Sequence, residues 1–214
     1  MKNQKWRHYL GVTCLFLTII SLAITLTINA YPLYVFDIKY LNILDWVDLS
    51  KTELLANYRQ LMAYLNLPWV SQLKMTDFPV SASGAFHFYE VKRLFMLNYG
   101  VLLITLIPSV IFLKESIKQK RLWKLVRPFQ IGALIPVGLG FGMLIGFQQF
   151  FETFHGVFFN NDDWLFDPAT DPIINVLPEA YFMHCFILAL VIFELIMLVG
   201  IVSGRRELKK ATES

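Results

Sequence analysis

Charged residues are scarce in this chain. They make up 16% of its 214 residues, whereas 56% are hydrophobic, and a soluble domain carries about 25% charged residues. The sequence also lacks tandem repeats, low-complexity tracts, a glycine-rich nucleotide-binding fingerprint and the Gly-x-Ser-x-Gly motif of serine hydrolases. This composition excludes an ordinary soluble domain, and the missing nucleophile motif favours a reaction without a covalent enzyme intermediate.

Cysteine is scarce as well. The two cysteines, Cys14 and Cys185, lie inside two different hydrophobic stretches, so we expect no structural disulfide. Neither is placed as a nucleophile, and both are expected to be apolar packing residues, as buried free cysteines usually are.

Four stretches of the chain are long and apolar enough to cross a bilayer, which takes about 20 residues. These stretches are Leu10–Tyr31, Leu94–Leu113, Phe129–Phe151 and Tyr181–Ser203. They predict an all-α membrane protein with four transmembrane helices, which form a single integral membrane domain over residues 1–214. The first stretch is too long for the core of a signal peptide and is not followed by a small-x-small cleavage site, so we interpret it as a retained anchor.

Lysine and arginine are unevenly distributed along the chain. Thirteen of the 19 basic residues lie near the N-terminus, between the second and third stretches, or after the fourth, and none lies between Glu152 and Glu179. By the positive-inside rule, both termini are cytoplasmic and the loop after Glu152 is extracellular. The net charge of +3 therefore reflects membrane topology and gives no reason to expect a nucleic-acid partner.

The outer loop between the first two stretches, from Pro32 to Arg93, contains a predicted helix. Ser50 and Glu53 have the spacing of a capping box, and apolar residues then recur at helical spacing until Pro68. These residues are Leu54, Leu55, Tyr58, Leu61, Met62 and Leu65. The pattern predicts an extracellular amphipathic helix that lies along the outer membrane surface. A helix packed on the rest of the protein is the alternative.

Two histidines lie at the outer ends of hydrophobic stretches, and each is three residues from a carboxylate. His87 is paired in this way with Glu90, and His155 with Glu152. Three-residue spacing places both members of a pair on one helix face, and titratable groups at a bilayer are functional candidates because they cost free energy. Since histidine exchanges a proton near neutral pH, we expect the two to supply a general base and a general acid at one outer site. The two glutamates would orient the imidazoles.

Other polar residues flank these stretches. Lys92 and Arg93 lie at the outer mouth of the second stretch, against the positive-inside trend. They are candidates for binding lipid phosphates or a substrate carbonyl, with two snorkelling side chains as the alternative. His184, one turn into the fourth stretch, is either a site residue or a hydrogen-bonded packing residue. Glu194 lies too deep to meet the outer histidines, so we leave it out of the site.

The same residues permit two other interpretations. Glu152 and His155 have the Glu-x-x-His spacing of di-iron bundles, but such bundles add further glutamates on facing helices, so we expect no metal and no cofactor. Alternatively, both histidines are structural hydrogen-bonding residues at helix ends. The chain would then be a non-enzymatic lipid-binding or accessory membrane protein.

A family resemblance covers nearly the whole chain. It is carried by Phe86-His87-Phe88 followed by Val91-Lys92, and by Phe154-His155 followed by Phe158-Phe159. Further matching segments are Tyr64-Leu65-Asn66, Asn161-Asp162, Trp164, Asp167-Pro168, Asp171 and Leu177-Pro178-Glu179. In order and spacing these segments resemble the lipoprotein intramolecular transacylases (Lit), although Glu90 stands where that family has aspartate.

The resemblance implies a membrane acyltransferase of Gram-positive bacteria, located in the plasma membrane. Such an enzyme moves the sn-2 acyl chain of a diacylglyceryl lipoprotein to the α-amino group of the lipoprotein's own N-terminal cysteine, which gives the lyso form. The family's two catalytic histidines correspond to His87 and His155 of this sequence. The implied partners are diacylglyceryl-modified bacterial lipoproteins and membrane lipid.

Overall fold

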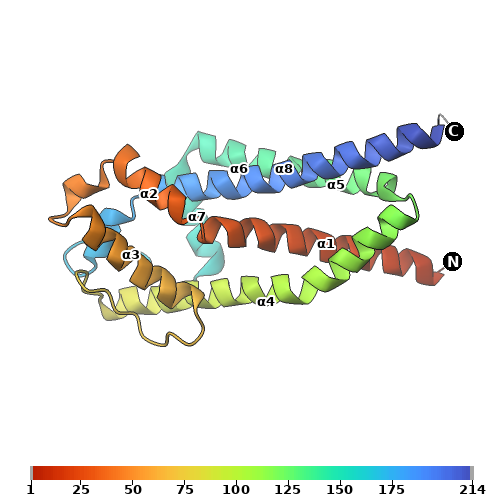
Figure 1. Ribbon diagram of the computed structural model, residues 1–214. Helices are drawn as coiled ribbons and strands as arrows, with labels where there is room; N and C mark the ends of the chain where they lie inside the picture. The colour runs from red at the N-terminus through yellow and green to blue at the C-terminus, as the bar shows by residue number, and fades with distance from the viewer. Residues whose placement is uncertain (1, 213–214) are drawn as a thin grey trace. The chain divides into compact units, whose positions relative to one another are not determined.

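The computed structural model describes residues 2–212, and every element of secondary structure in that range is a helix (Figure 1). The long helices are α1 (Lys2–Ile28), α4 (Ala82–Lys118) and α8 (Glu179–Thr212). The shorter ones are α2 (Tyr31–Tyr40), η1 (Ile43–Trp46), α3 (Lys51–Asn66), η2 (Leu122–Leu125), α5 (Val126–Gly132), α6 (Leu134–Ile145), α7 (Phe147–Phe158) and η3 (Pro172–Val176). The prediction of an all-α protein is confirmed.

Four helical segments are long and apolar enough to span a membrane. They are Lys5–Ile28, Ala82–Lys118, Leu122–Ile145 and Glu179–Lys210. Apolar side chains face outward on them, as Ile104 (76% exposed) and Leu144 (83% exposed) illustrate. Apolar surface on this scale is covered by lipid rather than by water. The chain is a multi-pass membrane protein, and the predicted number of spans is confirmed.

The third span differs from its predicted bounds, Phe129–Phe151. It is interrupted between α5 and α6, because Pro136 has no N–H to continue the helix and its ring crowds the carbonyl of Gly132. It ends before Gly146, which has extended backbone (φ −179°, ψ 105°) and separates α6 from α7. Glycine is a poor helix former, so the apolar residues after it belong to a separate short helix and not to the span.

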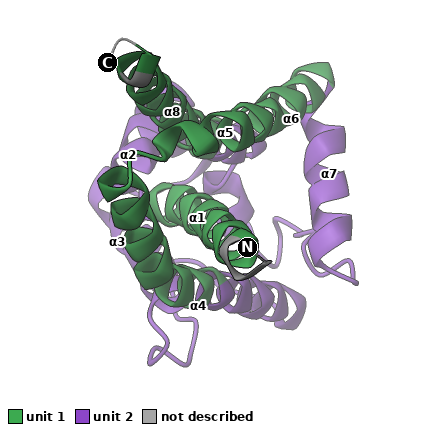
Figure 2. Cartoon of the chain, turned by 90° about the vertical axis from the view of Figure 1, so that its right-hand side faces the viewer, with its two compact units in different colours: residues 1–28, 98–145, 187–214 green, residues 29–97, 146–186 purple. Residues whose placement is uncertain are grey.

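The chain forms two compact units (Figure 2). Unit 1 comprises residues 1–28, 98–145 and 187–214, and unit 2 comprises residues 29–97 and 146–186. Helices α4 and α8 contribute to both units, since the boundaries after residues 97 and 186 fall inside them. The single membrane domain expected from the sequence stays a prediction.

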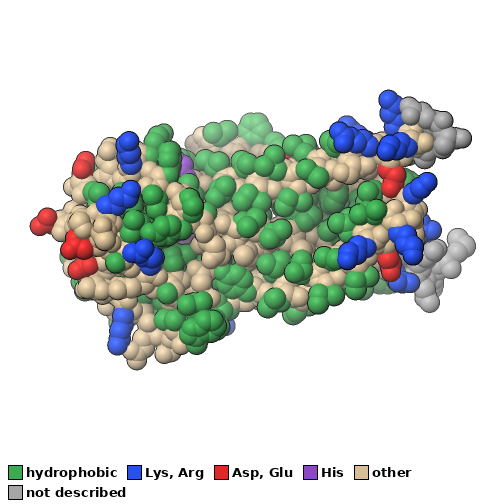
Figure 3. All heavy atoms as spheres, viewed as in Figure 1, with side chains coloured by type: hydrophobic (Ala, Val, Ile, Leu, Met, Phe, Trp, Pro, Cys, Tyr) green, Lys and Arg blue, Asp and Glu red, His purple; other side chains and the backbone are tan. Residues whose placement is uncertain are grey.

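Unit 1 is held together by close helix contacts and by hydroxyl groups. The Thr18 hydroxyl of α1 lies 2.9 Å from that of Thr105 and 2.8 Å from that of Ser109, both on α4. A Cβ at Gly200 of α8 would collide with the ring of Phe129 in α5, so the glycine permits this close approach. Lysine and arginine gather at the end of the unit where α1 begins and α8 ends (Figure 3). The basic segments that the sequence assigned to one membrane side therefore share one end of this unit.

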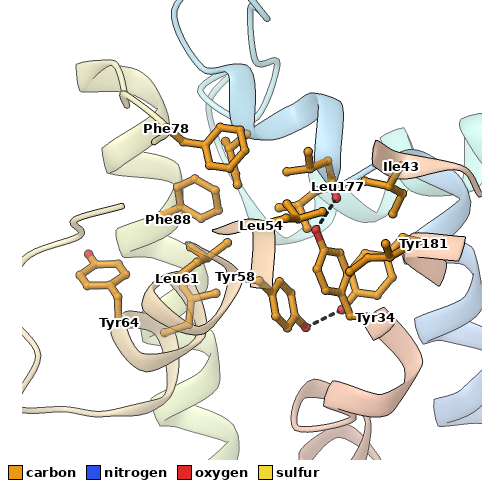
Figure 4. Close-up of a cluster of buried hydrophobic side chains, with 14 residues drawn as sticks. Tyr34, Ile43, Leu54, Tyr58, Leu61, Tyr64, Phe78, Phe88, Leu177 and Tyr181 are labelled. Atoms are coloured by element: carbon orange, nitrogen blue, oxygen red, sulfur yellow. Dashed lines mark hydrogen bonds between the residues drawn. The ribbon is translucent and has the colours of Figure 1, made fainter. Parts of the chain in front are cut away.

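Unit 2 has an aromatic core in which tyrosine hydroxyls are paired (Figure 4). Tyr34 of α2 stacks on Tyr58 of α3, with ring centroids 3.8 Å apart, and donates a hydrogen bond to the carbonyl of Val176 (2.9 Å). The hydroxyls of Tyr58 and Tyr181 are 2.8 Å apart. Burial raises the pKa of Tyr58 to about 12, so its hydroxyl stays protonated. These side chains join α2, α3, η3 and the start of α8.

Helix α3 forms where the sequence predicts it, with its capping box in place. Ser50 Oγ accepts a hydrogen bond from the N–H of Glu53 (3.3 Å), and Glu53 Oε2 accepts one from the N–H of Ser50 (2.8 Å). Its apolar face is buried in the core of unit 2, where Leu54, Leu61 and Leu65 are at most 5% exposed. The expectation that this face lies in the outer membrane surface is wrong, because protein side chains already remove the leucines from water. The alternative, a helix packed on the protein, is confirmed.

Candidate active site

The structure brings the two histidines predicted from the sequence together in unit 2. His87 lies in the second turn of α4, and His155 lies in the last turn of α7. Their ring centroids are 5.8 Å apart, with an angle of 36° between the ring planes, and each residue is only 7% exposed. Two imidazoles at this separation can both reach one reacting group.

The beginning of α4 is fixed by a carboxylate from the loop before η3. Asp171 Oδ1 accepts a hydrogen bond from the N–H of Ser81 (2.8 Å), and its Oδ2 accepts one from the hydroxyl of Thr170 (2.8 Å). Burial raises the pKa of Asp171, but these hydrogen bonds outweigh burial and hold it below the usual value. A Cβ at Gly84 would collide with this carboxylate, so the glycine lets a negative charge reach the N-terminus of α4, where it is favourable. The contact sets the position of the turn that carries His87.

A backbone carbonyl orients His155. Its Nδ1 lies 2.8 Å from the carbonyl oxygen of Phe151, one turn earlier in α7. A carbonyl can only accept, so Nδ1 carries the proton and Nε2 of the neutral ring carries the lone pair. Burial lowers the pKa of His155, while the bond to Phe151 opposes that shift. The ring is therefore neutral at neutral pH, with Nε2 available as a base.

His87 has a different environment. Its Nδ1 is buried and meets no hydrogen-bonding group in the part of the chain that the structure describes. The rings of Phe159 and Phe166 stand edge-on to it, with centroids at 4.7 and 5.6 Å. A buried ring nitrogen without a partner costs free energy. This atom is therefore suited to meet a polar group of a bound molecule.

The segment after α7 covers both imidazoles, and we call residues Phe159–Phe166 the covering loop. Trp164 stacks on His155, with centroids 4.5 Å apart and 26° between the planes. Phe159 and Phe166 lie against His87 as described above. Aromatic rings on these faces exclude water from the space beside the two imidazoles.

Neither predicted carboxylate is hydrogen-bonded to its histidine among residues 2–212. Both carboxylate oxygens of Glu90 accept from Nδ2 of Asn161, at 3.1 Å each. Glu152 is exposed and accepts a hydrogen bond from Gln148 (3.0 Å). The orienting role that the sequence analysis gave to Glu152 is held by the Phe151 carbonyl.

The two basic residues near the beginning of α4, Lys92 and Arg93, have different surroundings. Lys92 Nζ donates to the carbonyls of Leu67 (3.0 Å) and Val70 (2.5 Å) and lies 4.5 Å from the centroid of the Tyr64 ring. Lys92 therefore fastens the loop after α3 to α4. Arg93 is exposed, with its guanidinium 5.9 Å from the centroid of the Tyr89 ring, and its predicted role in binding lipid phosphates stays a prediction.

His184 lies apart from the two histidines. Its Nδ1 is 2.8 Å from Oδ1 of Asp37 in α2, which is fully buried. Burial raises the pKa of Asp37, while the bond to His184 lowers it. Phe182 and Phe186 of α8 pack on α7, and His184, between them in sequence, points to the other side of the helix. The hydrogen bond expected for His184 as a packing residue is present, and its exclusion from the site stays a prediction.

The sequence analysis missed several groups that build this site. Asn161 carried no signal as a site residue beyond its place in the family resemblance, because an asparagine after a helix usually indicates a turn. In the sequence, Trp164 and Phe166 could be packing residues as easily as site residues, so they gave no signal. The Phe151 carbonyl has no signature at all, since every residue carries one. Within residues 2–212, no cluster of three or more side chains suited to bind a metal ion occurs, and metal independence stays a prediction.

Comparison with known proteins identifies a family and a fold. The profile of the lipoprotein intramolecular transacylase family, Lit, matches residues 9–182. The solved structure of the membrane-integral lipoprotein intramolecular transacylase Lit from Bacillus cereus is 30% identical, has a TM-score of 0.92 and is matched over 98% of each chain. Two Bacillus cereus Lit structures with a histidine replaced, by arginine or by alanine, match at 29% identity. Their TM-scores are 0.82 and 0.83, over 98% of this chain and 93% and 96% of theirs. No curated protein sequence matches the chain.

The profile match and the solved structures each cover most of the chain. They also remove the alternative of a non-enzymatic accessory protein, because the family is one of enzymes that act on lipoproteins. This chain belongs to the lipoprotein intramolecular transacylase (Lit) family.

Proposed function

We propose that the enzyme moves the sn-2 acyl chain of a diacylglyceryl-modified lipoprotein to the α-amino group of the lipoprotein's N-terminal cysteine. The product is the lyso form, N-acyl-S-monoacylglyceryl-cysteine. The observation that carries the proposal is the pair of buried imidazoles with centroids 5.8 Å apart. Transfer of an acyl group from oxygen to nitrogen needs protons to leave the amine and a proton to reach the leaving oxygen, and two imidazoles supply both steps.

We assign the base role to His155 and the acid role to His87. The substrate enters as an ammonium ester and gives one proton to His87, and the resulting amine attacks the ester carbonyl. Nε2 of His155 takes a second proton from the nitrogen of the adduct. His87 returns its proton to the glyceryl oxygen as the carbon–oxygen bond breaks. The products are an amide, a free hydroxyl group and one proton on His155, which then leaves to solvent.

The contacts of the two rings support this division. The Phe151 carbonyl holds the proton of His155 on Nδ1, so its Nε2 is the acceptor in the neutral ring. His87 Nδ1 meets no hydrogen-bonding group among the described side chains and backbone, so the ring can shift its proton between substrate atoms. This scheme needs no metal and no cofactor.

Substrate geometry contributes the remaining rate enhancement. The amine and the ester belong to one molecule, and good positioning of such groups corresponds to effective molarities of about 10⁵–10⁸ M. Water in the site would hydrolyse the ester instead. The aromatic side chains of the covering loop keep water from the rings.

We propose supporting roles for the other predicted site residues. Glu90 positions the covering loop through Asn161, and Lys92 positions the loop after α3. Arg93 and Glu152 are exposed and can bind lipid phosphates and the substrate peptide, respectively. Diacylglyceryl lipoproteins and membrane lipid are thus the proposed partners.

We further propose that the protein lies in a bacterial plasma membrane, with both termini cytoplasmic and the active site toward the extracellular face. The basic segments at one end of unit 1 support this orientation (Figure 3). The segment from Glu152 to Glu179, which includes the covering loop, has no lysine or arginine.

The test replaces His87 or His155 by alanine and follows conversion of lipoproteins to the lyso form by mass spectrometry. Each variant should lose roughly 10²–10⁴-fold in rate, the usual contribution of a general acid or base. His8→Ala is the matched control, because His8 lies on α1 in unit 1, and it should keep the parent rate. Full conversion by both site variants, at equal amounts of folded protein in the membrane, would contradict the proposal.

A further inference from the structure

The covering loop shields both imidazoles from the surroundings. His87 and His155 are each 7% exposed, and Phe159, Trp164 and Phe166 occupy their faces. A substrate must bring its amine and its ester oxygen to within about 3 Å of ring nitrogens. Some part of the cover therefore has to move before the reaction.

Hydrogen bonds inside the covering loop would let it move as one rigid segment. Asn161 Oδ1 accepts a hydrogen bond from the N–H of Asp163 (3.1 Å). The N–H of Leu165 donates to the carbonyl of Asp162 (3.0 Å), and that of Phe166 donates to the carbonyl of Trp164 (3.1 Å). These bonds lie within the loop and would persist if it swung away from the histidines.

The loop is joined to α4 by a charged contact. Nδ2 of Asn161 lies 3.1 Å from each carboxylate oxygen of Glu90, one turn after His87 on α4. Hydrogen bonds to a carboxylate are about twice as strong as neutral ones. Both partners of this contact are half-buried, so water can solvate them when the loop lifts.

We propose that the covering loop is a lid over the two histidines, and that the Asn161–Glu90 contact is the latch that holds it shut. Opening of the lid admits the lipid-modified N-terminus, and closing brings Trp164 and Phe166 back over the reacting groups. The proposal rests on the proposed function for its purpose. Its structural claim, that Asn161 controls access to both imidazoles, can be tested without substrate.

The experiment measures how fast each imidazole of the detergent-solubilised protein is acylated by diethyl pyrocarbonate, with mass spectrometry of the individual peptides. Asn161→Asp keeps the shape of the side chain but sets two carboxylates against each other. It should raise the modification rates of His87 and His155 by about tenfold or more, the factor that corresponds to one charged hydrogen bond. His184 is the internal standard, since its partner is Asp37 and not the lid.

Two further variants make the test specific. Asn160→Asp adds the same charge one residue away, at an exposed side chain, and should leave both rates unchanged. Asn161→Asp combined with Glu90→Gln exchanges donor and acceptor, so the amide and carboxylate can bond again, and protection of both histidines should return. If Asn161→Asp does not fold, Asn161→Ala with the same readout takes its place.

Three results would overturn the latch. The first is an unchanged modification rate at His87 and His155 in Asn161→Asp. The second is a rise in the modification rate of His184 in that variant as large as the rise at His87 and His155. The third is a rise at His87 and His155 that persists when Glu90→Gln is added to Asn161→Asp. The proposed function fails on a separate result, retention of lipoprotein conversion by the His87→Ala and His155→Ala variants. The two failures are thus distinguishable.

Discussion

The two units of the molecule bury different kinds of polar side chains. Among the described residues, those buried in unit 1 are all hydroxyls: Thr18, Ser21, Thr27, Thr105, Ser109 and Ser116. Apart from the tyrosines of its core, those buried in unit 2 are acids, an amide and imidazoles: Asp37, Asn57, Asp171, His87 and His155. A hydroxyl can bond within its own helix, as Ser109 and Ser116 do with carbonyls four residues earlier. The buried carboxylates of unit 2 bond to other segments instead, as Asp37 does to His184 and Asp171 to Ser81, because a buried charge is costly without a partner.

This difference distinguishes the unit that carries most of the apolar spans from the unit that holds the candidate active site. The buried hydroxyls of unit 1 are small, and several of them bond within their own helix or to a neighbouring one, which suits a segment that spans a membrane. In unit 2, Asp37 is held by His184, Asp171 by Ser81, and Asn57 by Asp77. The loops of unit 2 are thus tied down by specific polar contacts, and these contacts fix the elements around the two histidines. Substitutions in the two units should therefore have different consequences.

The largest loss of stability should come from Asp37→Ala in unit 2. Removing a buried carboxylate breaks its hydrogen bond to His184 (2.8 Å), and a hydrogen bond to a charged group contributes about 1.5–3 kcal/mol, so we expect a loss of about 3 kcal/mol. The measurement is thermal unfolding in detergent. Asp45→Ala, at an exposed aspartate in η1, is the control and should have little effect.

Replacing both partners sharpens this prediction. A double substitution of Asp37 and His184 by leucine removes both partners and leaves no unpaired polar group, so it should recover most of the lost stability. A double variant as unstable as Asp37→Ala would show that the contact does not act as a pair.

The second prediction compares alanine substitutions at two helical glycines, one in each unit. Gly84→Ala in unit 2 drives a Cβ into the Asp171 carboxylate and should cost about 2 kcal/mol. It should also slow lipoprotein conversion, since the turn that carries His87 must shift. Gly138→Ala in unit 1 meets nothing within 4 Å and should stabilise α6 by about 0.5–1 kcal/mol. Equal effects of the two substitutions in unfolding experiments would remove Asp171 from its proposed place.

Local sequence patterns predicted those features of the structure that depend on residues close together in the chain. The four apolar stretches predicted the spans, and the capping box at Ser50 and Glu53 predicted where α3 begins. The pairing of His87 with His155 was predicted because both lie at the outer ends of hydrophobic stretches. The break at Gly146 was not predicted, since the apolar residues of α7 continue the hydrophobic run.

Contacts between distant segments could not be read from the sequence. Glu90 and Glu152 share a helix face with their histidines, yet their carboxylates bond to Asn161 and Gln148. Side-chain direction depends on which loop approaches, and the approach of Asn161 is a tertiary contact over 71 positions. Helical spacing shows which groups are neighbours, but not which of them bond.

The third prediction concerns the pH dependence of stability. Burial lowers the pKa of His155 below its ordinary value of 6.5, so the folded state binds fewer protons than the unfolded state below pH 6.5. The free energy of unfolding should therefore rise with pH up to about 6.5 and fall as the solution is acidified. The effect should be smaller than that of Gly84→Ala, and it is measured as melting temperature against pH. His155→Gln should flatten the profile between pH 5 and about 6.5, and an unchanged profile would show that this ring does not titrate as described.

The smallest effect should come from Thr18→Val in unit 1. The substitution removes the hydroxyl that contacts Thr105 and Ser109, but both of these still donate to carbonyls of their own helix. Hydrogen bonds between membrane helices contribute about 0.6 kcal/mol on average, so unfolding should change by about that amount, with the rate of lipoprotein conversion unchanged. Asn57→Ala in unit 2 should cost more, because it leaves the buried contacts to Asp77 unmade. A larger loss from Thr18→Val than from Asn57→Ala would show that the hydroxyls of unit 1 are as critical as the polar contacts of unit 2.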